Sequence, residues 1–230
     1  MEPVLGFDTS TPELTVALVA DGDVIAEREA SPDAGGRPRH ATALLATVEE
    51  VLAVGGGWDA VARIAVGIGP GTFTGLRIGI STARALTQSR GLGLAGVSSL
   101  ASLAAGVDSP QARLAVLDAK RGEAFAALYD PAGAELWPAW VGPPDELAER
   151  VRSLDAGPVA VGDGSVRFRD QLESAGALVP ADGDEVHRPR ARHLCRLADG
   201  VPDSREIEPD YLRRPDAELW RERDHRPPNG

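Results

Sequence analysis

The sequence predicts an α/β fold in which mixed β-sheets are flanked by helices. Three observations lead to this prediction. Three apolar segments joined by short turns open the chain, as in a β-meander. Strand patterns then alternate with helix patterns, and a second hairpin pattern begins after residue 110. The change from meander to alternation indicates a sheet with both antiparallel and parallel strand pairs.

The first three strands are expected at residues 4–9, 14–20 and 24–30. The dipeptide Asp21-Gly22 separates the second from the third, and Asp-Gly between apolar runs is a strong hairpin signal. The first helix is expected at residues 40–54, after a glycine-containing loop. Its apolar residues recur at the spacing of an amphipathic helix. They are Ala41, Leu44, Leu45, Val48, Val51 and Leu52.

The remaining elements form two groups, separated by a boundary at residues 108–110. The first group has strands at 61–68 and 95–97 and helices at 75–89 and 98–105. The second group has strands at 113–119, 123–129 and 159–161 and helices at 144–154 and 190–197. We therefore predict an N-terminal subdomain at 1–108, a smaller C-terminal subdomain at 109–214 and a flexible tail at 215–230.

Composition narrows the range of functions. The net charge is −11, and Lys120 is the only lysine, so strong binding of nucleic acid by this chain alone is not expected. No run of 18 apolar residues predicts a membrane helix, and the N-terminus does not resemble a signal peptide. Cys195 is the only cysteine, which excludes an intrachain disulfide. A cytoplasmic protein is expected.

The most informative segment runs from Gly69 to Gly79 and lies between a predicted strand and a predicted helix. Glycines allow close backbone approach, and a helix N-terminus without acidic residues attracts anions. A tight turn with a threonine N-cap and no ligand explains the segment about equally well. Asp8, at the end of the first strand, is compatible with a magnesium or phosphate site, although an Asx turn is favoured. The anion-binding candidates are Asp8, Thr9, Gly69, Gly71, Thr72, Thr74 and Gly75.

No catalytic residue and no metal ligand is predicted. His187 and His193 are six residues apart and would face different sides of a helix. No Ser/His/Asp arrangement can be recognised, and Cys195 lies among apolar residues as a packed thiol. The motif at residues 91–96 has the letters of a dinucleotide fingerprint, but it precedes a strand instead of following one.

Both helices of the first subdomain carry small side chains beside the positions expected to face the sheet. Small side chains allow a partner helix to approach closely. A helix that is apolar on more than one face is either an ordinary core helix or covered by a partner. On the first helix, Leu44, Leu45, Val48, Val51 and Leu52 are expected to face the sheet. The candidate interface residues are Ala43, Ala46, Thr47, Arg77, Ser81 and Arg84.

Six motifs together resemble the TsaB family. The run from Gly69 to Gly79 resembles the family signature, which commonly has serine where this chain has Thr72. The other five follow in the family's order along most of the chain. They are Asp8-Thr9-Ser10-Thr11-Pro12, Arg39-His40, Gly96-Val97-Ser98-Ser99-Leu100, Leu117-Asp118-Ala119-Lys120-Arg121-Gly122-Glu123 and Pro209-Asp210-Tyr211-Leu212-Arg213.

The resemblance implies an actin/hexokinase/Hsp70-like (ribonuclease H-like) fold with duplicated subdomains. It also implies that the chain dimerises through its first two helices with TsaD, the catalytic subunit that carries metal and nucleotide. The ATPase TsaE joins this assembly, and tRNA is bound mainly through the complex. The catalytic relatives have two metal-binding histidines four apart on the first helix. Here Leu44 stands at the second position, so His40 is expected to be an exposed helix-start residue.

Three functions remain in competition. The resemblance favours a non-catalytic scaffold subunit for N6-threonylcarbamoyladenosine synthesis, with no cofactor of its own because ATP and metal belong to the partner subunits. The alternative is a free-standing ATPase or phosphotransferase of the same superfold, which would bind and turn over Mg-ATP. A peptidase, as in the older glycoprotease-like name, has no recognisable catalytic group. Whether the isolated chain forms a homodimer through the same helices cannot be deduced from the sequence.

Overall fold

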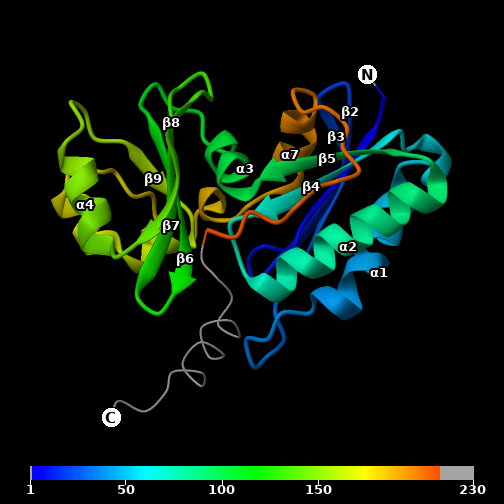
Figure 1. Cartoon of the computed structure of the whole chain (residues 1–230), viewed down its shortest axis with the longest axis horizontal. Coiled ribbons are helices and arrows are strands. Elements are labelled where there is room, and N and C mark those ends of the chain that lie inside the picture. The colour runs from blue at the N-terminus through cyan, green and yellow to red at the C-terminus, as the bar shows by residue number, and fades with distance from the viewer. Residues whose placement is uncertain (1, 213–230) are drawn as a thin grey trace, which may run out of the picture.

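The computed structural model describes residues 2–212 and shows two lobes, each built on one β-sheet (Figure 1). The sheet of the first lobe has the strand order β3-β2-β1-β4-β5. Strands β1, β2 and β3 pair antiparallel, whereas β4 and β5 run parallel to β1. The predicted mixed sheet is confirmed. Its strands are β1 (Val4–Asp8), β2 (Leu14–Ala20), β3 (Asp23–Ala30), β4 (Arg63–Gly69) and β5 (Gly93–Ser98).

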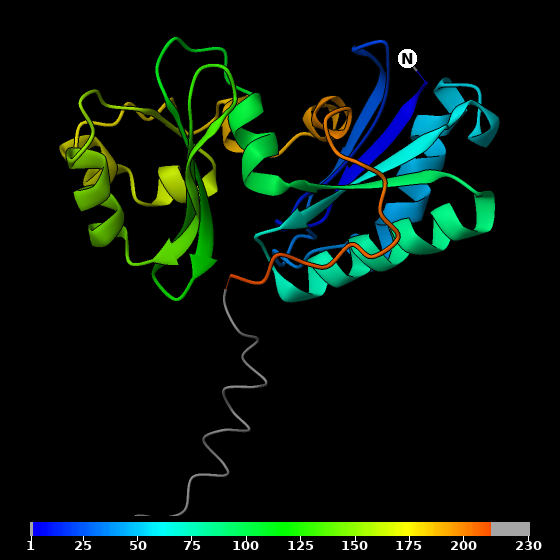
Figure 2. The ribbon, with the colours of Figure 1, turned by 45° about the horizontal axis from the view of Figure 1, so that its top comes forward.

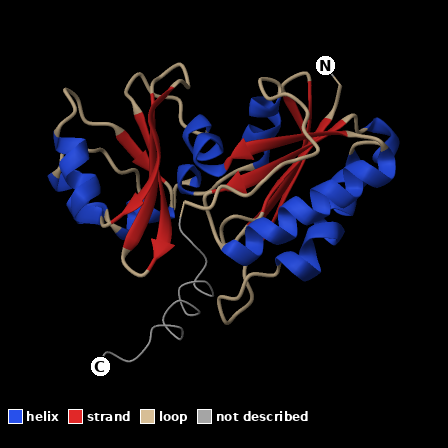
Figure 3. Cartoon of the chain, in the orientation of Figure 1, coloured by secondary structure: helices blue, strands red, loops and turns tan. Residues whose placement is uncertain are grey.

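Two long helices, α1 (His40–Val54) and α2 (Phe73–Arg90), lie side by side on one face of this sheet (Figures 1 and 3). The opposite face packs against α7 (Ala191–Ala198). Strand residues alternate between the two faces: Leu5 points into the core under α1 and α2, and Val4 into the core under α7. Gly6 lets α7 approach closely, because a Cβ there would lie 2.5 Å from Cys195 Sγ.

The second lobe has a four-stranded sheet with the order β8-β7-β6-β9. The predicted hairpin of β6 and β7 is confirmed, whereas β8 was not predicted because Pro138 interrupts its pattern. Short helices and 3-10 turns complete the structure. The strands are β6 (Arg113–Lys120), β7 (Glu123–Tyr129), β8 (Glu135–Gly142) and β9 (Val159–Val161). The other helices are α3 (Ser99–Ala105), α4 (Pro144–Arg152), α5 (Asp163–Arg167), α6 (Arg169–Ser174), η1 (Trp58–Ala60) and η2 (Glu185–His187).

The chain returns to the first lobe after it has built the second. Helix α7 buries Ala191, Leu194 and Cys195 against the first sheet, and residues 203–211 run beside α2 (Figure 2). The expected C-terminal subdomain at 109–214 is therefore corrected, because its last part belongs to the first lobe. The apolar stripe of α7 indicates that one side of the helix is buried. Which sheet covers that side is seen only in the tertiary structure.

Among residues 2–212, no helix has both the length and the apolar character that a membrane crossing requires. The tail predicted at residues 215–230 lies outside the described residues.

Candidate functional site

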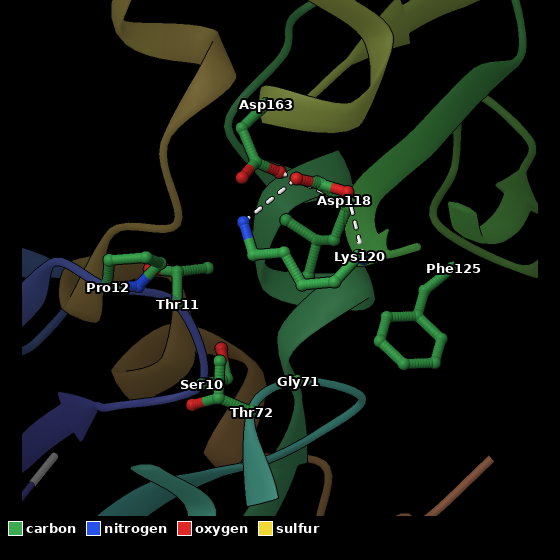
Figure 4. Close-up of a pocket in the computed structure, with 10 residues that line it drawn as sticks. Ser10, Thr11, Pro12, Gly71, Thr72, Asp118, Lys120, Phe125 and Asp163 are labelled. Carbon is green, nitrogen blue, oxygen red and sulfur yellow. Dashed lines mark hydrogen bonds and ion pairs between the residues drawn. The ribbon is translucent and has the colours of Figure 1, made fainter. Parts of the chain in front are cut away.

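Segments from both lobes meet in a small cleft. Ser10, Thr11 and Pro12 come from the β1–β2 turn, and residues 71–72 precede α2. Asp118 and Lys120 come from the end of β6, opposite Asp163 at the start of α5 (Figure 4). The enclosed volume is about 10 Å³, on the scale of one water molecule. Small-molecule sites generally have volumes of several hundred Å³, so this cleft is too small for a nucleotide.

Asp118 is the electrostatic centre of the cleft. Its Oδ2 accepts from Lys120 Nζ and from Arg167, each at 2.8 Å, and its Oδ1 accepts from the Lys120 backbone N–H at 2.8 Å. Burial alone would raise the pKa of Asp118, but the hydrogen bonds from Lys120 and Arg167 hold its pKa below the usual value. The carboxylate is thus fully engaged within its own lobe.

Lys120 is a cleft residue that the sequence analysis did not identify as a site candidate. It lies at a bulge between β6 and β7 and has a φ of 64°, which is uncommon for a residue with a side chain. The bulge directs the only lysine of the chain toward the β1–β2 turn of the other lobe (Figure 4). The sequence around Lys120 does not indicate that the side chain enters the cleft, because the β1–β2 turn that it faces lies about a hundred residues earlier in the chain.

Asp8 and Thr9 do not line the cleft. Asp8 Oδ1 accepts from the Ser10 backbone N–H at 2.7 Å, which is the favoured Asx turn, and Oδ2 accepts from Ser99 Oγ at 2.8 Å. Thr9 is fully buried and donates from Oγ1 to Gly75 O at 2.8 Å. Both side chains hold the β1–β2 turn in place, so the favoured turn is confirmed at Asp8 and neither residue lines the cleft as an anion-binding candidate.

The glycines of the signature segment serve close packing. A Cβ at Gly71 would lie 2.5 Å from Ser10 O, and a Cβ at Gly75 would collide with Thr9 O. Gly69, with a φ of 106°, makes the sharp turn between β4 and α2. The ligand-free alternative, a tight strand-to-helix turn, therefore accounts for Gly69 and Gly75.

Thr72 is the N-cap of α2, as the ligand-free alternative supposed, but its hydroxyl forms no cap hydrogen bond. The helix begins at Phe73, two residues earlier than predicted, because the Thr72 N–H is held by Ser10 O at 2.8 Å. Thr74 is exposed on the first turn. Of the seven anion candidates, only Gly71 and Thr72 line the cleft. Ser10, which was not a candidate, also lines it and has a buried Oγ without a hydrogen-bond partner.

A buried Ser165–His187 pair is the closest approach to a hydrolase site among residues 2–212. His187 Nδ1 lies 3.2 Å from Ser165 Oγ, and its Nε2 lies 3.1 Å from Pro180 O. Ser165 is fully buried and hydrogen-bonds to Gly162 O at 2.7 Å. The group that hydrogen-bonds to the far side of the His187 ring is thus the Pro180 carbonyl and not a carboxylate. The Ser165 hydroxyl is buried and out of reach of a substrate. This geometry does not match a catalytic triad.

The neighbouring cavity between the lobes is larger, with a volume of about 260 Å³. Its wall includes three prolines, three carboxylates and one arginine. The residues are Thr11, Pro12, Glu13, Pro32, Asp163, Val166, Asp182, His187, Arg188 and Pro189. Among residues 2–212, no group of three or more His, Cys, Asp or Glu side chains is placed to hold a metal ion.

One prediction about the histidines is corrected. His40 was expected to be exposed, but it is 3% exposed beneath the β1–β2 turn, and burial lowers its pKa. His187 belongs to η2 and His193 to α7, so they do not share a helix face. Burial, with nearby arginines, lowers the pKa of His193 to about 4.

Cys195 is a packed thiol as predicted, and burial raises its pKa, which makes it unreactive.

Helix α1 buries four of the five residues expected to face the sheet, Leu44, Val48, Val51 and Leu52. Ala43 and Thr47 are buried in the lobe, and Thr47 Oγ1 donates to Ala43 O at 2.9 Å, so both are removed from the candidate interface. Leu45, expected to face the sheet, is 56% exposed. Small residues at 43 and 47 let the helix lie close to the sheet. The exposed face of α1 contains Ala41, Thr42, Leu45, Ala46, Glu49, Glu50, Ala53 and Val54.

On α2, the candidates Arg77, Ser81 and Arg84 are exposed, as is Ala85. Both arginines contact the chain's own C-terminal segment. Arg77 Nε donates to the Tyr211 hydroxyl at 3.1 Å, and Arg84 donates to Ile207 O.

Comparison with known proteins identifies similar sequences along nearly the whole chain. A family model described as TsaD, tRNA N6-adenosine threonylcarbamoyltransferase, matches residues 24–152. The tRNA threonylcarbamoyladenosine biosynthesis protein TsaB of Escherichia coli K12 is 34% identical over 91% of this chain and 94% of its own length. The protein of the same name from Bacillus subtilis 168 is 29% identical over 94% and 96%.

Solved structures agree with the predicted fold. YeaZ from Pseudomonas aeruginosa superposes with a TM-score of 0.77 at 27% identity, over 92% of this chain and all of that one. A ROK hexokinase from Thermus thermophilus gives a TM-score of 0.51 at 14% identity, over 86% of this chain and 98% of that one. The second likeness concerns the fold alone. The predicted actin- and hexokinase-like architecture is confirmed.

Proposed function

Because this chain belongs to the TsaB family, we propose that it takes part in making N6-threonylcarbamoyladenosine in tRNA, as a non-catalytic subunit that dimerises with TsaD. The modified adenosine lies next to the anticodon of tRNAs that read codons starting with A. In this role the chain activates and positions the transferase, and it performs no chemistry itself.

The observation that carries the proposal is the uncovered outer face of α1 and α2. Leu45 and Val54 on α1 are 56% and 57% exposed, and Ala46 between them is also exposed. Ser81 and Ala85 on α2 continue the surface with small side chains. Small and apolar side chains on two adjacent helices suit close packing against two helices of a partner. We call these five residues the docking face.

Trp58 links α1 to the C-terminal end of α2. Trp58 donates from Nε1 to Glu49 of α1 at 3.0 Å, and the guanidinium carbon of Arg90 of α2 lies 4.0 Å from the centre of the Trp58 ring. A surface whose shape is set before binding loses less entropy when a partner docks. The contacts of Trp58 with Glu49 and Arg90 therefore support a docking role for the two helices.

The cleft supports a division of labour between subunits. The charged side chains of Lys120 and Arg167 are bonded to Asp118, and the volume of the cleft is about that of one water molecule. In the proposed complex, ATP and metal belong to TsaD and TsaE. The tRNA is bound mainly through the assembly, because a chain of net charge −11 repels the phosphate backbone. The proposed place of action is the cytoplasm. Any homodimer of the isolated chain would form through the same face of α1 and α2.

The central experiment places a charge on the docking face. Ala46→Glu and Ser81→Glu should each abolish co-purification with TsaD, because an unpaired carboxylate in a helix interface is costly to desolvate. Ala132→Glu, on an exposed loop of the second lobe, is the matched control and should bind normally. Circular dichroism should show that all three variants are folded. Normal TsaD binding by both helix variants would refute the proposed interface.

Two further measurements separate the proposal from the ATPase alternative. Depletion of the protein should remove threonylcarbamoyladenosine from tRNA, as measured by nucleoside analysis. Calorimetric titration of the isolated protein with Mg-ATP should show no binding at micromolar concentration, because the cleft is closed. Micromolar affinity with turnover would instead favour a free-standing enzyme.

A further inference from the structure

Residues 203–211 form an extended segment, here called the strap, that runs beside α2 from β5 toward the junction of the lobes (Figure 2). Its start is fixed by an ion pair of 2.6 Å between Arg63 and Asp203. Two backbone hydrogen bonds attach it to the sheet: Ser204 N–H to Leu94 O at 2.9 Å and Asp210 N–H to Ile68 O at 2.8 Å. The strap therefore lies on the edge strand β5 and on the end of β4.

The strap holds two arginines of the α2 surface, Arg77 and Arg84. Arg84 donates to Ile207 O, and Arg77 donates to the Tyr211 hydroxyl at 3.1 Å. The Tyr211 ring stacks on Phe73 with 5.1 Å between ring centres, and the Arg77 guanidinium lies 3.9 Å from the Phe73 ring centre. In both cases the arginine is bound to a neutral acceptor of the chain itself.

Few contacts hold the strap in place. It contains no helix or strand, and Ile207 is its one fully buried side chain, set against Gly96, where a Cβ would lie 2.9 Å from it. Tyr211 is 37% exposed. The remaining side chains are half-buried or open to solvent. A segment with so few buried contacts opens at a lower free energy than the lobe unfolds.

We propose that the strap is an intramolecular competitor for the α2 surface, and that docking of TsaD releases it from Arg77 and Arg84. This inference rests on the proposed function. A guanidinium bonds more strongly to a carboxylate than to a neutral carbonyl or phenol. Carboxylates of the docking partner therefore displace Ile207 O and the Tyr211 hydroxyl, and the freed arginines extend the docking face along α2.

The competition lowers the affinity for the partner. When only a fraction of molecules has the strap released, the apparent dissociation constant is the intrinsic one divided by that fraction. A substitution that loosens the strap should then tighten TsaD binding, whereas ordinary removal of an interface side chain weakens it. The sign of the effect distinguishes a competitor from a permanent part of the docking surface.

The test uses three variants of the full chain. Tyr211→Ala removes the ring stack and the hydrogen bond from Arg77, and Tyr211→Phe removes the hydrogen bond alone. We expect calorimetry with TsaD to show about threefold to tenfold tighter binding for Tyr211→Ala and a smaller gain for Tyr211→Phe. Glu208→Gln changes an exposed strap residue that forms no hydrogen bond or ion pair of its side chain within residues 2–212, and it should bind as wild type.

Amide hydrogen exchange gives a second readout that does not need the partner. The N–H groups of Ser204 and Asp210 report attachment of the strap. They should exchange faster in free Tyr211→Ala, and faster in the wild type when TsaD is bound. Equal or weaker TsaD binding by Tyr211→Ala, with both amides still protected in the complex, would overturn the proposal.

The same measurements separate this proposal from the proposed function. If the wild type does not bind TsaD at all, the proposed function fails. Unchanged exchange of Ser204 and Asp210 in free Tyr211→Ala would refute the detachable strap even when TsaD binds the docking face normally.

Discussion

The cleft between the lobes and the docking face of α1 and α2 have opposite characters. In the cleft, Asp118 is held by Lys120 and Arg167, and the turns from the two lobes leave about 10 Å³ between them. On the docking face, Leu45 and Val54 expose more than half of their surface. The polar region is closed and its charges are paired with each other, and the apolar region is open. The difference suggests that recognition by this protein takes place on its helices.

The largest effect on stability is expected where the two regions meet, at Gly75. A Cβ at this position would collide with Thr9 O of the β1–β2 turn. Gly75→Ala should therefore lower the free energy of unfolding by about 1–3 kcal/mol, as measured by urea denaturation. Gly183→Ala is the control, because open space surrounds Gly183, and its effect should stay within about 0.5 kcal/mol. Wild-type stability of Gly75→Ala would show that the close packing is not needed.

Two leucines of similar exposure test whether binding depends on the docking face or on exposed apolar surface in general. Leu45 on α1 is 56% exposed, and Leu136 on β8 of the second lobe is 53% exposed. Leu45→Glu should weaken TsaD binding at least about tenfold, as expected for a central interface residue, and Leu136→Glu should leave it unchanged. Calorimetry measures both affinities. Equal losses in the two variants would mean that exposed apolar area, and not the docking face, determines binding.

A smaller, pH-dependent effect is expected at His40, which lies beneath the β1–β2 turn of the cleft and begins α1. Its folded-state pKa is lowered by burial, so the unfolded chain takes up the proton first as the pH falls. Stability should then be complete above the unfolded pKa of about 6.5 and decline below it. Urea denaturation at pH 7.5 and 5.5 should show a smaller decline in His40→Asn. An identical decline would assign the effect to other groups.

The smallest effect is expected at Lys120. Its side chain is 55% exposed, and Arg167 still holds Asp118 after its removal, so Lys120→Ala should cost less than about 1 kcal/mol of stability. The folded-state pKa of Asp118 is lowered, so its contribution is present at neutral pH and is lost as the pH falls through that pKa. TsaD affinity should not change. Loss of TsaD binding in Lys120→Ala would show that the cleft takes part in the complex.

Much of the fold could be predicted because its signals are local. The β1–β2–β3 meander, the β6–β7 hairpin and both long helices were found from apolar periodicity and turn residues. Strand β8 was missed because Pro138 interrupts its alternation, and α5 and α6 were missed because helices of five and six residues contain too few turns to show a period.

The site was predicted less completely. The signature turn was located, and two of its residues, Gly71 and Thr72, line the cleft. Ser10 and Lys120 are not among the seven candidates, because they come together from positions 110 residues apart in the chain. Asp8 and Thr9 were listed as candidates although a turn was favoured there, and the structure shows the turn: they are bonded to Ser99 and Gly75 in the interior.

The sequence by itself determined the order of elements, the position of the turns and the family, because each depends on residues that are neighbours along the chain. Only the tertiary structure decided that α1 buries Ala43 and Thr47 and exposes Leu45, that α7 packs on the first sheet, and that the strap holds Arg77 and Arg84. The spacing of apolar residues along a helix indicates that one side of the helix is buried. It does not record which surface covers that side, because the covering surface is built from distant parts of the chain.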